Sequence, residues 1–235
     1  MDGNDNLLLA SLPPAQRDRW ERDLALVELH AGQVLHEPSV RVEHVYWPIS
    51  AIVSLSQVVG TGATAEVAVV GPEGLVGMAA FLGGGAALSR AVVQHAGRAW
   101  RQDAGALKRE FDQGAELMAM LLRYAQVMIT QTAQSVVCIR HHELEQQVCR
   151  WLLLRLDRMH SCELNITQAL IAKFLGVRRE GVTEVAGRLQ RTGVLRYSRG
   201  HIVVLDRAAL ERVSCECYRV IRGEYHRLLA PHLAH

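Results

Sequence analysis

Two arginines, a glutamate and a threonine stand close together in the segment "GVRREGVTEVAGRLQ". Arg178 and Arg179 are followed directly by Glu180 and then by Thr183. An arginine can donate two hydrogen bonds to guanine, and a glutamate can accept one from cytosine. Two arginines at the start of a helix oppose the helix dipole, which favours a partner that supplies negative charge. These side chains therefore predict contact with DNA bases, although a charged helix start that only improves solubility is the alternative.

The residues around them predict a winged helix-turn-helix. Thr167 is placed to cap a first helix, Gly176 to form a sharp turn, and a second helix follows it with an apolar inner face. After Gly193, "VLRYSRGHIVVLD" predicts a β-hairpin, and Asp206 is placed to cap one last helix that continues to "HRLL". Further side chains are placed to contact phosphates, although a plain surface role is equally open for each: Thr167, Gln168, Lys173, Arg188, Ser198, Arg199 and His201.

Charge is distributed unevenly along the 235 residues. From Ile166 onward there are 12 Lys and Arg against 6 Asp and Glu, whereas residues 1–165 hold 14 against 18. A basic C-terminal part that follows an acidic N-terminal part is typical of a polyanion-binding module joined to another domain.

The N-terminal half predicts a small β-barrel or jelly roll. Residues 31–105 contain short β-branched segments separated by Gly, Pro and Ser: "QVLHE", "HVYWPI", "AIVSLSQVV", "AEVAVV" and "RAVVQHAGRAW". The flanking segments "PPAQRDRWERDLAL" and "DAGALKREFDQ" predict helices.

A long helix is predicted between residues 114 and 157, with a polar interruption at "RHHELEQQ" where one domain gives way to the next. Apolar and small residues recur in it at alternating intervals of three and four, as in a heptad seam. We expect this seam to form a dimer contact, although packing on the chain's own barrel would also require an apolar stripe. The seam consists of Met118, Leu121, Ala125, Met128, Thr132, Ser135 and Ile139.

Several classes of protein are excluded by what the sequence lacks. No nucleophile elbow, HExxH motif or convincing carboxylate pair is present, so we expect no catalytic residues and no enzyme. The start "MDGNDNLLLASLPPAQ" is no secretory signal and no window is apolar enough to span a membrane, so we expect a cytoplasmic protein.

The five cysteines, an odd number without a C-x-x-C motif, predict reduced and mostly buried thiols. They are Cys138, Cys149, Cys162, Cys215 and Cys217. Only "CEC" could form a redox or metal site, but side chains two residues apart in a helix point about 200° apart. We therefore predict no metal site, and a redox role of this pair stays open.

A small barrel, a long central helix and "GVRREGVTEVAGRLQRTGVL" with its wing resemble the Crp/Fnr family of bacterial transcription regulators. The resemblance covers Leu29 to Leu210, and Arg179, Glu180 and Val182 match the core of the family's recognition helix. It implies an α+β fold with a sensor domain at 1–113, a dimerisation helix at 114–142 and a winged helix-turn-helix domain at 143–235. It departs at Glu184, where cyclic-AMP-binding members have another base-reading arginine.

In this family "EGLVGMAAFLGGGAALSRAVV" corresponds to the loop that binds the phosphate of a cyclic nucleotide. Gly77 stands where the family has glycine, but Met78 replaces the glutamate that binds the ribose, while Arg90 can still match the phosphate arginine. The resemblance thus implies a retained pocket that has lost its usual cyclic AMP contacts. Its residues would be Gly77, Met78, Ala79, Ser89, Arg90, Ala91 and Thr132.

Other cofactors of the family require different ligand residues. Iron-sulfur members use N-terminal cysteines, and none occurs here before Cys138, which argues against such a cluster. Haem stays open, with these histidines as candidate ligands: His30, His36, His44, His95 and His141. The effector is not identified by the sequence.

Two functions from different classes follow from these observations. The first is a homodimer that binds palindromic double-stranded DNA, with RNA polymerase and a small-molecule effector as further possible partners and no membrane contact. The alternative is a signal-sensing module that acts through protein interaction without sequence-specific DNA binding.

Overall fold

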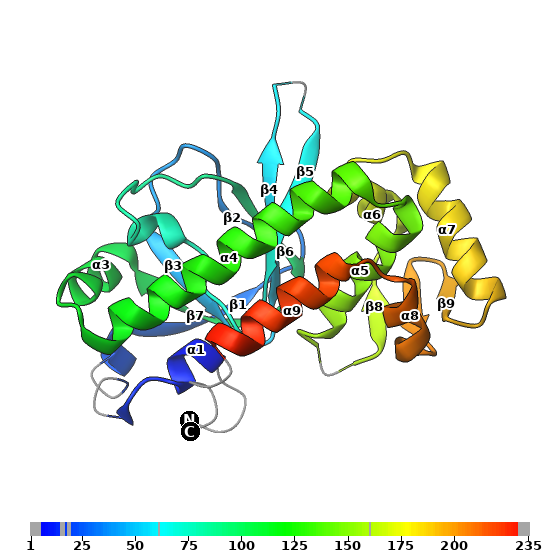
Figure 1. Ribbon diagram of the computed structural model, residues 1–235. Helices are drawn as coiled ribbons and strands as arrows, with labels where there is room; N and C mark the ends of the chain where they lie inside the picture. Colours follow the sequence, from blue (N-terminus) through cyan, green and yellow to red (C-terminus); the bar gives the residue numbers. More distant parts are fainter. Residues whose placement is uncertain (1–5, 15–16, 18–19, 61, 160, 230–235) are drawn as a thin grey trace.

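The computed structural model describes residues 6–14, 17, 20–60, 62–159 and 161–229. Figure 1 shows an elongated molecule with strands at one end, the helices α6, α7 and α8 at the other, and α4 running between them. Of the predicted first helix, residues 15, 16, 18 and 19 lie outside the described part of the chain.

Two antiparallel sheets form the N-terminal part, as the sequence predicted for a small barrel or jelly roll. One sheet has the order β1-β7-β3 and the other β2-β6-β4-β5. Their side chains enclose a common core that contains Val45, Trp47, Val53, Val70 and Val93. The strands are β1 (Leu24–Leu29), β2 (Val34–His36), β3 (His44–Pro48), β4 (Ile52–Val58), β5 (Thr64–Val70), β6 (Arg90–His95) and β7 (Gly97–Asp103).

Two strand boundaries differ from the prediction. Residues 24–26, expected at the end of a helix, begin the strand Leu24–Leu29, which pairs along its whole length with β7. The segment "RAVVQHAGRAW" divides at Ala96 into β6 and β7, which belong to different sheets. Both differences arise from pairing between distant segments, which a local pattern does not contain.

Short helices complete this part of the molecule. Asp103 caps α3 by accepting a hydrogen bond from the Ala106 backbone N–H at 2.8 Å, so the predicted second flanking helix is present. The short elements here are α1 (Leu7–Ala10), η1 (Glu21–Asp23), η2 (Met78–Ala80) and α3 (Ala104–Asp112).

The predicted long helix consists of α4 (Ala115–His141) and α5 (Leu144–Leu156), separated at the expected polar interruption. Glu143 and Gln146 form a capping box that begins α5. Within the described parts of the chain, no helix has both the length and the hydropathy that crossing a membrane needs.

Most of the predicted heptad seam of α4 faces the interior of the chain itself. Four of its seven residues are buried in the chain itself: Leu121, Ala125, Met128 and Ser135. The Ser135 hydroxyl donates to the Val67 carbonyl at 2.9 Å, and the Gln131 amide bonds both backbone groups of Val69. The prediction that these four residues face a second subunit is therefore wrong, because they are buried within this chain.

Of the other three seam residues, Met118 and Ile139 are exposed and Thr132 is half-buried. A second heptad stripe, displaced by one residue, is exposed on α4: Leu122, Gln126, Ile129, Ala133 and Val136.

The C-terminal part is a winged helix-turn-helix followed by two helices. Its three-stranded sheet has the order β8-β10-β9, and β8 was not predicted. The predicted last helix is interrupted at Ser214 and Cys215, and α9 then lies beside α4 (Figure 1). The elements are β8 (Glu163–Asn165), α6 (Gln168–Leu175), α7 (Arg179–Arg191), β9 (Leu195–Ser198), β10 (His201–Val204), α8 (Arg207–Val213) and α9 (Glu216–Leu228).

Candidate nucleic-acid interface

The two helices of the motif are positioned by residues that the sequence pointed to. The Thr167 hydroxyl caps α6 by accepting from the Leu170 N–H at 3.2 Å. Gly176 ends that helix in the left-handed region with φ of 68°, which favours glycine. Val182, Val185 and Leu189 then bury one face of α7 in the core of this part of the molecule. The opposite face of α7 is consequently presented to solvent.

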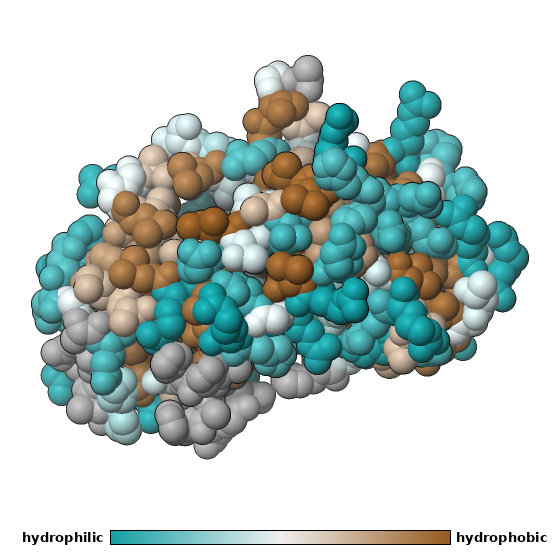
Figure 2. All heavy atoms as spheres, viewed as in Figure 1, coloured by the Kyte–Doolittle hydropathy of each residue, from teal (hydrophilic) through white to brown (hydrophobic). Residues whose placement is uncertain are grey.

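The predicted base-reading side chains lie on that solvent face. Arg178 occupies the N-cap position of α7, and Arg179, Glu180 and Thr183 follow in its first turns, all exposed. The Thr183 hydroxyl donates to Gln168 Oε1 at 2.7 Å, so the two helices also meet through these polar groups. Figure 2 shows mainly hydrophilic residues over this end of the molecule.

Arg188 differs from the other predicted contacts because it is already paired. Its guanidinium lies 3.2 Å from Glu145 and 2.7 Å from Glu184. The hydrogen bond to Glu145 raises the pKa of Arg188 above its ordinary value. In this conformation Arg188 neutralises two carboxylates of its own chain.

The wing is a tight hairpin between β9 and β10. Arg199 and Gly200 form its turn with φ of 46° and 85°, and Ser198 and Arg199 are exposed. His201 Nε2 lies 3.0 Å from Glu163 Oε2, so this wing residue also has a partner in its own chain. Lys173 is exposed on α6.

Six of the seven predicted effector residues lie around η2 and the start of β6, and the seventh, Thr132, lies on α4. Gly77 has φ of 109° and precedes η2, whereas Ala91 is buried in the barrel core. Met78, Ala79, Ser89 and Thr132 are half-buried. The Arg90 guanidinium lies 3.1 Å from Glu37, so the group expected to bind phosphate is paired with a carboxylate.

A hollow of about 510 Å³ lies beside this region, between the start of α3 and the turn that follows η2. None of the seven predicted effector residues lines it. The lining residues are Arg41, Val42, Glu43, His44, Ala80, Gly85, Asp103, Ala104, Gly105 and Lys108.

Two buried ion pairs join α5 and the turn that follows it to the barrel, and no pattern in the sequence indicated them. Arg155 lies 2.5 Å from Glu66 of β5, and Arg158 lies 2.7 Å from Glu73. Burial lowers the pKa of Arg155 to about 10, which the Glu66 carboxylate opposes. The partners are 89 and 85 residues apart in the chain, so no local motif could have predicted the pairing.

Models of two protein families match the chain in succession. The cyclic nucleotide-binding domain matches residues 26–113, and the Crp-like helix-turn-helix domain matches residues 146–213. These two domains and the fold define a transcription regulator in which a sensor-type barrel precedes a DNA-binding domain. The chain belongs to the Crp/Fnr family of transcriptional regulators.

Solved structures of the family have the same fold. A Crp/Fnr family regulator from Eubacterium rectale is 19% identical, with a TM-score of 0.69 over 88% of this chain and 96% of that one. FixK2 from Bradyrhizobium japonicum is 14% identical, with a TM-score of 0.68 over 82% and 98%. A CRP/FNR family regulator from Thermus thermophilus is 23% identical, with a TM-score of 0.66 over 81% and 98%. None of the curated proteins matches the chain.

Proposed function

We propose that this regulator is a homodimer that binds a palindromic DNA site through the first turns of α7. The observation that carries the proposal is the exposure of Arg178 and Arg179 at the start of a helix whose other face is buried. Within the described residues neither arginine has an ion-pair partner, in contrast to Arg188. Two free guanidinium groups at the positive end of a helix are suited to an anionic partner that accepts hydrogen bonds.

The exposed face of α4 supports the homodimer. Leu122, Ile129 and Val136 follow one another at intervals of seven and are 47%, 62% and 62% exposed. Apolar residues at heptad spacing on an unpartnered helix face are suited to a second copy of the same helix. Such a twofold pairing would place two copies of α7 on successive turns of one face of a duplex.

The sensor domain supports regulation by something other than the usual cyclic AMP contacts. Position 78 is Met, whose thioether sulfur accepts hydrogen bonds only weakly, whereas the carboxylate of a glutamate accepts them strongly. Arg90 is held by Glu37, so a phosphate would have to displace that carboxylate. We infer that cyclic AMP is not the effector, while contact with RNA polymerase stays a prediction.

Selection from a pool of random duplex DNA tests the proposed function. We expect purified protein to enrich a sequence with dyad symmetry and half-sites about 10 base pairs apart, with affinity that falls steeply as salt is raised. Binding without any enriched sequence would contradict the proposal. If regulation in cells then survived replacement of Arg178 and Arg179 by Ala, the alternative of a module that acts through protein interaction would be favoured.

A further inference from the structure

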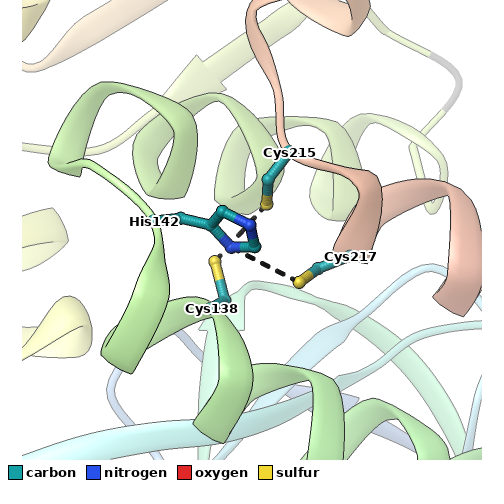
Figure 3. Close-up of side chains that lie close together, drawn as sticks. All are labelled: Cys138, His142, Cys215 and Cys217. Atoms are coloured by element: carbon teal, nitrogen blue, oxygen red, sulfur yellow. Dashed lines mark hydrogen bonds between the residues drawn. The ribbon is translucent and has the colours of Figure 1, made fainter.

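Four side chains of metal-ligand type converge where α4 ends and α9 begins (Figure 3). Cys138 and His142 come from the end of α4, and Cys215 and Cys217 from the start of α9. One ligand atom from each lies within 4.8 Å of the other three. Cys138 Sγ lies 3.5 Å from Cys215 Sγ, and Cys217 Sγ lies 3.6 Å from His142 Nδ1.

The backbone explains why these residues meet. Cys138 and His142 are four residues apart, which places them on the same face at the end of α4. Cys215 is the N-cap of α9 and has an extended conformation, with φ of −77° and ψ of 164°. The prediction of no metal site assumed that Cys215 and Cys217 share one helix, and this premise is wrong. The interruption before α9 lets both thiols point to the same centre.

We propose that Cys138, His142, Cys215 and Cys217 bind one tetrahedral divalent cation of the zinc type. Zinc–sulfur bonds of about 2.3 Å and zinc–nitrogen bonds of about 2.0 Å put the ligand atoms of a tetrahedron roughly 3.5–3.8 Å apart. The measured separations of 3.5 and 3.6 Å agree with this spacing. A disulfide between two of the sulfurs would instead require a separation of about 2.0 Å.

The groups next to the cluster suit a bound cation. Glu216 Oε1 lies 3.1 Å from His142 Nε2, so a proton on Nε2 can be donated to the carboxylate while Nδ1 keeps its lone pair for the metal. The three thiols are nearly fully buried, and the His142 side chain is 11% exposed. A closed set of four protein ligands is typical of a structural zinc site.

Arg150 offers a positive charge that can balance the net negative charge of the occupied metal site. Cation binding releases three thiol protons, so three thiolates and one divalent cation leave a net charge of −1. Arg150 is 5% exposed, and Ser135, which it contacts, lies one helical turn before Cys138 on α4. Its Nε has no hydrogen-bond partner in the described part of the molecule, and Nη1 is 3.4 Å from the Ser135 hydroxyl. A buried guanidinium with so few partners is costly unless an opposite charge lies nearby, and an anionic metal centre would supply that charge.

The cation would connect the start of α9 to the junction between α4 and α5, where the DNA-binding part begins. His142 is the C-cap of α4 and precedes α5 directly, so the site lies at the interruption between these two helices. Gain or loss of the ion would therefore change the stability of the contact between α9 and the junction of α4 with α5. This inference is independent of the proposed DNA binding, because it rests only on the four ligands and their neighbours.

Elemental analysis of the purified full-length chain, kept under reducing conditions without chelator, tests the site. We expect about one zinc per chain in the unaltered protein and less than about a tenth of that in Cys217→Ser, because a three-ligand site binds far more weakly. Cys162→Ser is the matched control, since Cys162 is exposed and lies outside the cluster. This control is expected to keep the full metal content.

Cobalt substitution gives a second readout, which is spectroscopic. We expect Co²⁺ added to metal-free protein to produce the visible absorption of a tetrahedral thiolate site, and His142→Gln to weaken it. Unaltered protein without bound zinc and without this absorption would overturn the proposal. Iron with inorganic sulfide, or a mass lower by two thiol hydrogens that shows a disulfide within the cluster, would overturn it as well.

Discussion

At the scale of single residues, Glu184 is the position at which this chain departs most clearly from cyclic-AMP-binding members of the family. Its side chain is 71% exposed on the same helix as the two free arginines and lies 2.7 Å from Arg188. A carboxylate repels the guanine acceptors that an arginine would bind, but it can accept a hydrogen bond from the cytosine amino group. We therefore expect a half-site that differs from the one preferred when arginine stands here.

Glu184→Gln tests this account of base preference. Glutamine can pair with adenine through two hydrogen bonds, so preference at one base pair of each half-site should move from cytosine towards adenine. The expected loss on the original site is about 1–3 kcal/mol. The measurement is equilibrium binding to a set of duplexes with single base-pair changes.

Glu28→Gln is the control for the charge that Glu184→Gln removes. Glu28 is exposed on β1 of the barrel and should leave the order of preference unchanged. If the order of base preference were also unchanged in Glu184→Gln, the side chain at position 184 would not face the bases.

At the scale of elements, α4 has two faces with different partners. One face is attached to β5 through Gln131 and Ser135, and the other exposes the stripe that contains Ile129 and Val136. Only the exposed stripe is available to a second subunit, so a charge placed there should act on association rather than on folding.

Val136→Asp is expected to weaken dimerisation. Removing a buried valine from an interface costs roughly 1.5 kcal/mol or more, and a twofold interface contains the change twice. The dissociation constant should thus rise by about a hundredfold or more. Sedimentation equilibrium measures it, and Val40→Asp, at a valine 56% exposed outside α4, should leave it unchanged. A dimer equally stable in both variants would contradict the assignment of this face.

The buried pair of Arg155 and Glu66 should contribute to stability far more than an exposed pair does. Arg155→Ala leaves a buried carboxylate without its cation, which lowers the free energy of unfolding by about 3–5 kcal/mol. Arg90→Ala, which removes the exposed partner of Glu37, should cost less than about 1 kcal/mol. Denaturant unfolding of both variants makes the comparison. If Arg155→Ala and Arg90→Ala lowered the free energy of unfolding equally, the pair of Arg155 and Glu66 would not attach α5 to the barrel.

The sequence predicted those elements whose determinants are local. Thr167, Gly176 and the apolar spacing of α7 lie within a short stretch, so the helix-turn-helix could be predicted from it. The register of α4 could not, because Leu121 and Met128 are spaced in the same way as Leu122 and Ile129. The choice between the two stripes depends on Val67 and Val69, whose backbone groups bond Ser135 and Gln131. Likewise, the cluster around Cys215 depends on a helix interruption that places it beside Cys138.

At the scale of the whole molecule, the sensor barrel and the DNA-binding part are joined through α5 and α9. Arg155 and Arg158 pair with the barrel, and Tyr225 of α9 packs against the cores of both parts. A change of conformation in the barrel can therefore be transmitted to α5 and α9 through these buried contacts, and α5 in turn packs against α7. This arrangement suits a regulator whose DNA affinity depends on the state of its sensor.

The central claim is that the start of α7 reads DNA bases, and the specificity ratio of Arg179→Ala tests it most directly. The ratio compares binding to the selected site with binding to a duplex of shuffled sequence, measured at one salt concentration. Arg101→Ala, which removes an exposed arginine from β7, is the matched control. We predict that the ratio falls about tenfold or more in Arg179→Ala, because a two-bond contact contributes about 1–3 kcal/mol of discrimination, and stays unchanged in Arg101→Ala. An equal ratio in both variants and the unaltered protein would contradict the account.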